Sequence, residues 1–469
     1  MANNTKELGT RNVRELLVEY SGPAIAAMLA SALYNVIDRA FVGQGVSALA
    51  ISGLAITMPI MNLSAAFGAM IGAGGATLTS IKLGQQDSES AQKVLGNVFL
   101  LNVVIGYIFM VFGLEFLDNI LYFFGASEDT IPYAKDFMQV ILIGNVITHL
   151  YLGLNSIMRA SGHPQKAMRM TFLTVLINLV LAPLFIFVFK WGIRGAASAT
   201  IIAQTAAFII IMKHFSNKDN LIHWERKIFK FDPRIIKGII SIGMAPFMLN
   251  ACACLVVILI NKGLKEYGGD LAVGAYGGVV NSVLMVFAMI VMGLNQGMQP
   301  IAGYNFGAQI YSRVKGVLKI TIVAATCVTT FAFLISETIP YYVARLFTKD
   351  EELIGMAITG LRICSAAFPI VGFQMVTSNF FQSIGKASKA VVLSSTRQLL
   401  LLVPLLLILP THYKTIESVL VCMPISDALS TILAFILLKL EMKKYNKLKD
   451  KPLIGSEPSA EASKELTKL

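Results

Sequence analysis

Charge is scarce in this chain. Asp, Glu, Lys and Arg together make up 14% of its 469 residues, whereas a typical soluble domain carries about 25%. Hydrophobic residues reach 55%, and the mean hydropathy is +0.69. This balance excludes an ordinary soluble enzyme and predicts a protein that crosses a membrane many times. The net charge of +12 comes from Lys and Arg in short turns and near the C-terminus, not on one face, so we expect no nucleic-acid partner.

Cysteine and histidine are also few, with five of each. The cysteines lie in apolar stretches without zinc-ligand spacing, so we interpret them as small buried hydrophobic residues. No GxxxxGK[ST] motif occurs, which argues against ATP hydrolysis by this chain. The histidines are scattered, and no cluster of His, Ser and carboxylate is visible in the sequence. We therefore expect neither an enzyme nor a bound cofactor.

What the chain has in abundance is long apolar runs. A spanning helix needs about 20 mostly apolar residues, and twelve runs qualify. Several exceed about 25 residues, so these must tilt, bend or project beyond the bilayer. Their approximate limits are 16–39, 48–81, 94–117, 131–158, 167–189, 192–213, 236–262, 272–302, 317–342, 353–384, 390–410 and 415–438.

Basic residues set the expected orientation. If the N-terminus is cytoplasmic, most of the 39 Lys and Arg residues fall in inside turns, as the positive-inside rule requires. We therefore predict an all-α polytopic protein with both termini in the cytoplasm. Its expected parts are an N-terminal segment (1–15), an N-lobe (16–213), a linker (214–235), a C-lobe (236–440) and a largely disordered tail (441–469).

The two predicted lobes repeat each other. Pro23 and Pro246 lie 223 residues apart, and two glycine pairs share that offset: Gly84 with Gly307, and Gly162 with Gly385. Each half would hold six helices, so both halves enter the membrane from the same side, as a parallel repeat. Two pseudo-symmetric six-helix lobes with a central cleft are typical of transporters that alternate access, which we expect to be driven by an ion gradient.

The eighth run keeps polar side chains at membrane depth, where they mark a solute pathway or link helices. A single helical face of this run combines amides with methionines, which suit surfaces that adapt to varied ligands. We take this face, with Asn35 of the first run, as the predicted substrate-binding set. The face consists of Asn281, Met285, Met289, Met292, Gln296 and Gln299. Ordinary lobe packing remains the alternative for any single methionine.

Six segments in order give the chain a resemblance to the multidrug and toxic compound extrusion (MATE) family, in particular its bacterial branch of DinF- and MepA-type exporters. They are ALYNVIDRAFVG (32–43), LGQQD (83–87), LNSIMRASGHP (154–164), WGIRGAASATIIAQ (191–204), GLNQGMQPIAGYNFGA (293–308) and FFQSIGK (380–386). The resemblance implies a V-shaped pair of lobes in the bacterial inner membrane, and export of cationic or amphipathic drugs by H⁺ or Na⁺ antiport. We expect a monomer whose partners are such drugs and the lipid bilayer.

Asp38 is the strongest candidate for the coupling site. A carboxylate in an apolar run can take up a proton or hold Na⁺, although a solvated pair with Arg39 is the alternative. The resemblance supports Asp38 and adds Asn178 and Thr200 as cation-coupling residues. The aspartate that the family carries in its fifth helix falls on Ala182 here, so Asp38 would carry more of the coupling alone.

Other buried ionisable groups leave alternatives open. Asp427 could be a second titrating site, a partner for Arg362 or Arg397, or a helix–helix link, and we favour a structural role. His149 is interpreted as a packed helix residue with one hydrogen bond.

Two function classes compete with drug export. A lipid-linked oligosaccharide flippase of the same superfamily would need cationic residues in its cavity, and the sequence places the basic residues at the turns. A membrane-embedded enzyme or a non-transporting scaffold would leave Asp38 and the polar eighth run without a use.

Overall fold

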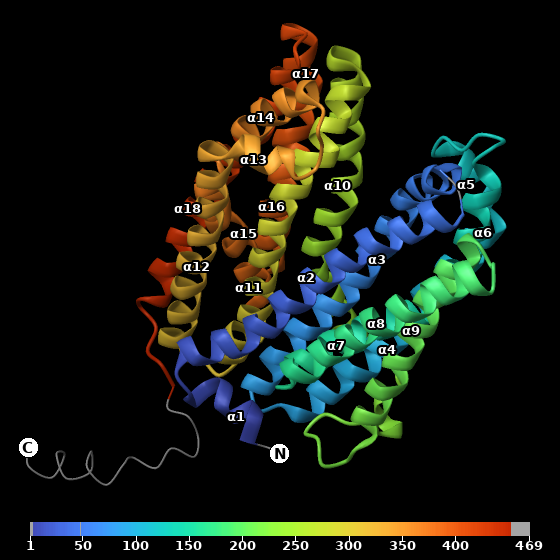
Figure 1. The fold of residues 1–469 in the computed structure, drawn as a ribbon. Helices are drawn as coiled ribbons and strands as arrows, with labels where there is room; N and C mark the ends of the chain where they lie inside the picture. Colours follow the sequence, from blue (N-terminus) through green and yellow to red (C-terminus); the bar gives the residue numbers. More distant parts are fainter. Residues whose placement is uncertain (1–2, 47, 452–469) are drawn as a thin grey trace, which may run out of the picture.

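The computed structural model describes residues 3–46 and 48–451. Over these residues the regular structure is helical and no strand occurs (Figure 1). The prediction of an all-α membrane protein is therefore confirmed. Within the described ranges, ten helices are long and apolar enough to cross a bilayer, and the number rises to twelve if each of two bent pairs counts as one span.

The N-terminal half begins with a short helix and ends at the linker. Its elements are α1 (Asn3–Thr10), α2 (Val13–Gly45), α3 (Ala48–Gly84), α4 (Ser88–Glu115), α5 (Leu117–Phe123), α6 (Ile131–Ile143), α7 (Asn145–Ala160), α8 (Pro164–Pro183), the π-helical turn η1 (Leu184–Val188) and α9 (Ile193–Ser216). Asp87 begins α4 by accepting a hydrogen bond from the Ser90 amide, which is the usual role of a helix N-cap.

The C-terminal half follows a short linker helix, η2 (Arg226–Ile228). Its elements are α10 (Pro233–Gly274), η3 (Ala275–Val280), α11 (Asn281–Gly307), α12 (Tyr311–Thr338), α13 (Pro340–Arg345), α14 (Glu351–Ser365), α15 (Phe368–Ser383), α16 (Ala387–Ser395), η4 (Thr396–Leu402), α17 (Val403–Tyr413) and α18 (Ile416–Tyr445). Within α10 the backbone breaks at Gly269, where φ is 69°, a conformation that glycine adopts readily. This break separates the two predicted runs 236–262 and 272–302.

Two of the predicted runs are bent. The run 131–158 forms α6 and α7 at 55° to each other, and the run 353–384 forms α14 and α15 at 52°. The first bend falls at Gly144, where an added Cβ would lie 2.4 Å from a methyl carbon of Ile201. The second falls at Ala367, 223 residues later, just before Pro369 at the start of α15. The internal repeat therefore extends to the bends.

The halves form the two arms of a V (Figure 1). The arms meet at a base near α1 and diverge toward α5 and α6 on one side and α17 on the other. Each arm also contacts the first helix of the other, because α3 packs on α10 and α11 packs on α2. The predicted two-lobed architecture is confirmed.

Glycines bring the two lobes into close contact at the base. A Cβ added to Gly84 would lie 1.9 Å from the Tyr304 carbonyl oxygen, and one added to Gly307 would lie 2.1 Å from the Ile81 oxygen. Gly84 and Gly307 lie 223 residues apart, and so do Ile81 and Tyr304, so the two contacts are reciprocal. Backbone approaches of this kind between membrane helices require small residues.

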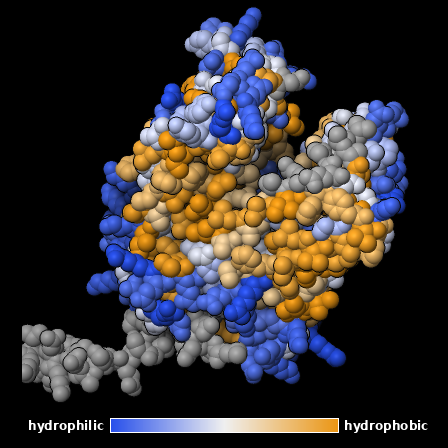
Figure 2. Space-filling model, viewed as in Figure 1, coloured by the Kyte–Doolittle hydropathy of each residue, from blue (hydrophilic) through white to orange (hydrophobic). Residues whose placement is uncertain are grey.

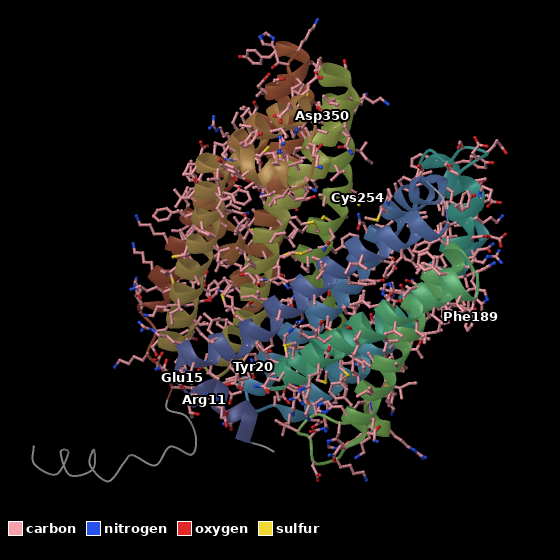
Figure 3. All side chains as sticks on the ribbon, viewed as in Figure 1. Arg11, Glu15, Tyr20, Phe189, Cys254 and Asp350 are labelled. Atoms are coloured by element: carbon pink, nitrogen blue, oxygen red, sulfur yellow. The ribbon has the colours of Figure 1, made fainter. Side chains whose placement is uncertain are left out.

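The surface matches a lipid environment. Figure 2 shows a broad hydrophobic band across the visible face, with hydrophilic residues at its two ends. Charged residues lie at both ends, for example Arg11 at the base of the V and Asp350 near the far end of the C-lobe (Figure 3). Large apolar side chains are exposed on both lobes, for example Leu176 and Val180 on α8 and Phe331 on α12. In water such a surface would be costly, whereas in a bilayer it is satisfied by lipid.

Candidate functional site

A cavity of about 510 Å³ lies where the two lobes meet. Its walls come from α2, α3, α7, α8 and α9 of the N-lobe and from α10, α11, α15, α16 and η4 of the C-lobe. This volume is in the range of small-molecule sites. The lining is rich in side-chain amides, which are Asn155, Asn178, Gln204, Asn250, Asn295, Gln296, Gln299, Gln374, Asn379 and Gln382.

The structure places half of the predicted α11 face on this cavity. Met292, Gln296 and Gln299 line it, whereas Asn281, Met285 and Met289 lie farther along α11, toward its N-terminal end, outside the lining. Gln299 is buried. It links the C-lobe to α3 of the N-lobe, because its Nε2 donates to Thr77 Oγ1 at 2.7 Å and to the Ala73 oxygen at 3.1 Å. The side chain of Asn35 lies outside the described residues.

Three neutral side chains of the N-lobe form a hydrogen-bonded triangle on the cavity wall. Asn178 Nδ2 donates to the Tyr34 hydroxyl at 3.0 Å and to Thr200 Oγ1 at 2.9 Å, and the two hydroxyls are 3.0 Å apart. Since Thr200 donates its own proton to the Ala196 oxygen, Tyr34 is the donor to Thr200. The predicted residues Asn178 and Thr200 are therefore in direct contact, and Tyr34, which the prediction missed, joins them.

One oxygen of this triangle has an unused lone pair. Among the described residues, Asn178 Oδ1 is buried and accepts no hydrogen bond. Buried polar atoms are nearly always satisfied, so an exception calls for a missing partner. A protonated group, a water or a cation would satisfy this oxygen.

Asp38 lies one helical turn beyond Tyr34 on α2, a spacing that puts the two side chains on one helix face. It is partly buried. Tyr34 lines the cavity, whereas Asp38, one turn farther along α2, lies outside its lining. The side chain of Arg39, the alternative partner, lies outside the described residues.

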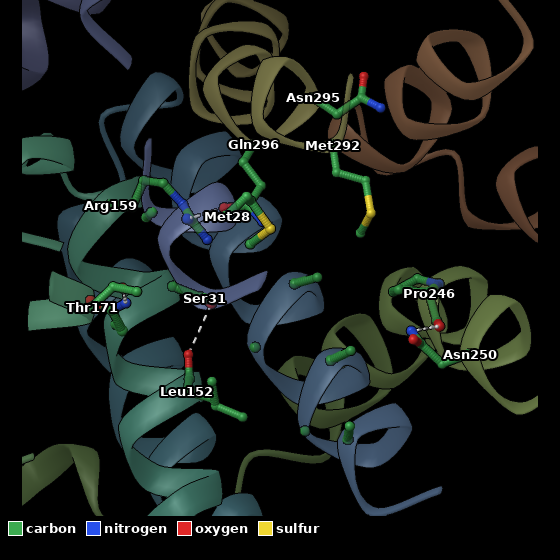
Figure 4. A pocket seen from close by; sticks show the side chains of 18 of the residues that line it. Met28, Ser31, Leu152, Arg159, Thr171, Pro246, Asn250, Met292, Asn295 and Gln296 are labelled. Atoms are coloured by element: carbon green, nitrogen blue, oxygen red, sulfur yellow. Dashed lines mark hydrogen bonds between the residues drawn. The ribbon is translucent and has the colours of Figure 1, made fainter. Parts of the chain in front are cut away.

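Two arginines also line the cavity. The expectation that basic residues stay at the turns is wrong for Arg159 on α7 and Arg397 on η4. Arg159 lies next to the last residue of its helix, but helical side chains lean back toward the helix N-terminus, which directs this one away from the turn. Arg159 Nη1 donates to Gln296 Oε1 of the opposite lobe, and Figure 4 shows the two side chains pointing toward each other.

Comparison with known proteins identifies the family. The MatE family model matches residues 23–184 and again residues 245–408. The chain belongs to the MATE family. Multidrug export protein MepA of Staphylococcus haemolyticus (strain JCSC1435) is 26% identical over 399 residues, which cover 85% of this chain and 87% of that protein. Members of the family are transporters, so the chain is a membrane transport protein and not an enzyme.

Solved MATE structures share the fold. DinF-BH, a MATE multidrug transporter solved in complex with rhodamine 6G, is 33% identical with a TM-score of 0.87, and the match covers 94% of this chain and 98% of that one. A multidrug resistance MATE transporter of the MOP superfamily, solved in an outward-facing conformation, is 22% identical with a TM-score of 0.88 and the same coverage. The recognition of the MATE family from sequence motifs is confirmed.

This MATE protein has no polar group at Ala182. Ala182 is fully buried in an apolar cluster with Phe185 and Ala199, where an ionised side chain would be costly. Among the residues that the structure describes, no group of three or more His, Cys, Asp or Glu side chains could hold a metal ion. Any cation held here would thus depend on Asp38 and neutral oxygens.

Asp427 forms an ion pair, one of its three predicted alternatives. Arg397 Nε lies 2.7 Å from Asp427 Oδ1, and the carboxylate is buried. Arg362 instead lies 3.7 Å from Glu337. The pair links η4 to α18 of this MATE protein and neutralises Arg397.

His149 is packed as the sequence suggested. Its Nε2 lies 3.0 Å from Ser64 Oγ, and Ser64 donates to Asn145 Oδ1 at 2.9 Å. These contacts hold α7 against α3 next to the bend at Gly144. His149 is therefore part of the N-lobe core.

Proposed function

We propose that the chain is a secondary active transporter that exports cationic and other amphipathic drugs by H⁺ or Na⁺ antiport. It would work in a bacterial inner membrane with both termini in the cytoplasm. The observation that carries the proposal is the amide-lined cavity between two repeated lobes, with the Tyr34–Asn178–Thr200 triangle on its wall and Asp38 one helical turn beyond Tyr34 on α2.

The arrangement of the lobes supports alternating access. At the end that holds the termini the lobes are in backbone contact through Gly84 and Gly307, and at the other end they diverge. Figure 2 shows the hollow between the diverging arms. With cytoplasmic termini this is an outward-open state, so a drug in the cavity could leave to the outside. Rocking of one lobe against the other would open the opposite side.

The coupling ion would act through α2. This helix carries Tyr34 and Asp38 on the N-lobe, and nearer its start it packs on α11 of the C-lobe. A cation at Asp38 would neutralise a charge one helical turn from Tyr34, and the unused lone pair of Asn178 Oδ1 offers a neutral oxygen ligand or hydrogen-bond acceptor. Either change alters the cavity wall and the helix that links the lobes.

The names of the relatives support drugs as cargo. MepA is named as a multidrug export protein, and DinF-BH was solved with rhodamine 6G. A lipid-linked oligosaccharide flippase is not favoured by these relatives. The substrate face that we propose in this chain is Met292, Gln296 and Gln299, which share the cavity wall with the triangle.

Ethidium efflux from energised cells that lack their own exporters tests the proposal. Wild type, Asp38→Asn and the control Asp118→Asn would be expressed at equal levels, with and without Na⁺ and at two pH values. Asp118 is a suitable control because it is exposed and paired with Lys135 on the surface.

We expect efflux by wild type and by Asp118→Asn and a loss of coupled efflux in Asp38→Asn, because the amide cannot exchange a proton. The buffer dependence would name the ion. Undiminished efflux by Asp38→Asn would remove Asp38 from the mechanism, and absence of efflux by wild type would contradict ethidium export.

A further inference from the structure

The two arginines of the cavity differ in their partners. Arg397 is neutralised by Asp427 at 2.7 Å. For Arg159, among the described residues, no carboxylate lies within ion-pair distance, and its hydrogen bond goes to the neutral Gln296. Apart from these two arginines, the described residues that line the cavity carry no charged side chain. Among the described side chains, the cavity thus holds one positive charge that no carboxylate balances.

An unbalanced guanidinium in this position is costly. Arg159 is partly buried; withdrawing a charge from water without a counter-charge is unfavourable, and an amide oxygen offsets only part of that cost. A guanidinium also has five N–H donors in a planar fork that matches a carboxylate. Gln296 uses one side of this fork, so Arg159 retains donors for a ligand.

The surroundings of Arg159 suit the rest of an amphipathic molecule. Met28, Met292 and Tyr151 line the same cavity and supply apolar and aromatic surface. Met28 also touches Gln296, since Gln296 Nε2 lies 3.7 Å from its sulfur. Figure 4 shows Met28, Arg159 and Gln296 together on one side of the cavity, with Met292 nearby. A ligand could therefore place an anionic group on Arg159 and its apolar body on the methionines.

We propose that Arg159 binds an anionic group of the substrate, so that the cavity prefers amphipathic molecules with a carboxylate, zwitterions included, over purely cationic ones. This proposal rests on the proposed drug-export function and specifies the charge of its cargo. Gln296 belongs to the C-lobe and Arg159 to the N-lobe. A carboxylate on the donors that Gln296 leaves free would thus bind directly beside a hydrogen bond that joins the two lobes.

Rhodamine 6G and its free acid form a matched pair of probes. The first carries an ethyl ester and a net positive charge, and the second carries a carboxylate in place of the ester and is a zwitterion. Fluorescence polarisation with the purified full-length protein in detergent would give the affinity for each. The variants are Arg159→Gln and, as a charge-matched control, Lys166→Gln, because Lys166 is exposed in the next helix.

We expect wild type and Lys166→Gln to bind the acid more tightly than the ester. In Arg159→Gln the affinity for the acid should fall by about tenfold or more, as expected for a lost charge-assisted hydrogen bond, with little change for the ester. If Arg159→Gln does not elute as a single folded species, Arg159→Lys provides the comparison. It keeps the charge but loses the fork, so its loss should be smaller than tenfold.

The outcomes separate this proposal from the one on which it rests. An equal preference for the acid in wild type and Arg159→Gln, or tighter binding of the ester by wild type, would overturn the role of Arg159 and leave drug export standing. Binding of neither probe by wild type would count against both.

Discussion

At the residue scale, the Tyr34–Asn178–Thr200 triangle connects the predicted coupling carboxylate to the cavity. Asn178 gives both of its N–H groups to the two hydroxyls, and Thr200 is fixed by the Ala196 oxygen. Tyr34 is the member of the triangle nearest to Asp38 along the chain, one helical turn before it on α2. Protonation or cation binding at Asp38 can therefore affect the cavity wall through Tyr34.

We expect Tyr34→Phe to weaken the apparent affinity for the coupling cation by roughly fivefold. The change removes one hydroxyl, and a hydrogen bond contributes about 1 kcal/mol, which corresponds to that factor. The measurement is the concentration of H⁺ or Na⁺ that gives half-maximal drug efflux from proteoliposomes with an imposed gradient.

Tyr107→Phe is the control for this change, since Tyr107 is exposed on α4 and its hydroxyl is far in sequence from the triangle. It should leave the half-maximal concentration unchanged. A Tyr34→Phe variant that titrates like wild type would show that the triangle is structural and does not sense the cation.

The sequence predicts a site residue when a motif or a spacing along the chain identifies it, and fails when the residue reaches the site only through packing against the other lobe. Asn178 and Thr200 came from the family motifs, and Tyr34 could have been found from its spacing of four from Asp38. Arg159 could not be placed from hydropathy alone. It lies next to the last residue of α7, and only the packing of the other lobe, through Gln296, shows that its side chain is in the cavity.

At the element scale, α3 and α11 hold the base of the V together by a reciprocal backbone contact. Gly84 lies against the Tyr304 oxygen and Gly307 against the Ile81 oxygen. Neither contact leaves room for a methyl group, and the atoms in the way belong to the backbone, which cannot rotate aside. The contact should be tight in the observed state and must be released when the base opens.

Gly307→Ala should therefore destabilise the protein, by about 1–3 kcal/mol, which is typical of overpacking. Thermal unfolding in detergent, followed by light scattering or a thiol-reactive dye, measures the effect as a lower unfolding temperature. Gly316→Ala on the neighbouring helix α12 is the control, because a Cβ there meets nothing within 4 Å. It should be neutral or slightly stabilising, and equal unfolding temperatures for the two variants would contradict the close contact.

The sequence predicted the helices better than their bends. Length and hydropathy located the spans, and the 223-residue offset related the halves. The bend at Gly144 escaped prediction because its close neighbour is Ile201 on α9, far along the chain. Its counterpart at Ala367 has a local signal in Pro369, and the offset could then have transferred the bend to Gly144.

At the scale of the whole molecule, the N-terminal segment precedes the N-lobe but is held by the C-lobe. Leu8 is fully buried, and its carbonyl oxygen accepts from Asn305 Nδ2 at 2.9 Å and from Arg313 Nη2 at 3.0 Å. Arg313 also donates to the Arg11 oxygen at 2.6 Å. This latch, made of Leu8, Arg11, Asn305 and Arg313, joins the lobes at the base. The alternating access that we propose would require these contacts to loosen when the base opens.

We expect Arg313→Gln to shift the population toward the base-open state by about tenfold, because hydrogen bonds from a charged donor contribute about 1.5–3 kcal/mol and the latch exists only while the base is closed. The measurement is the distance between spin labels at Gln165 and Ser388, which are exposed and related by the 223-residue offset, in a background with Cys254 and Cys327 replaced by serine.

The distance distribution should gain a longer component in Arg313→Gln and keep the wild-type form in Lys319→Gln, a control that removes an exposed charge from the same helix. Asn305 still bonds the Leu8 oxygen in the variant, so the base should be loosened rather than lost. An unchanged distribution would mean that the glycine contact between α3 and α11 alone keeps the base closed, and that the N-terminal segment follows the lobes without holding them.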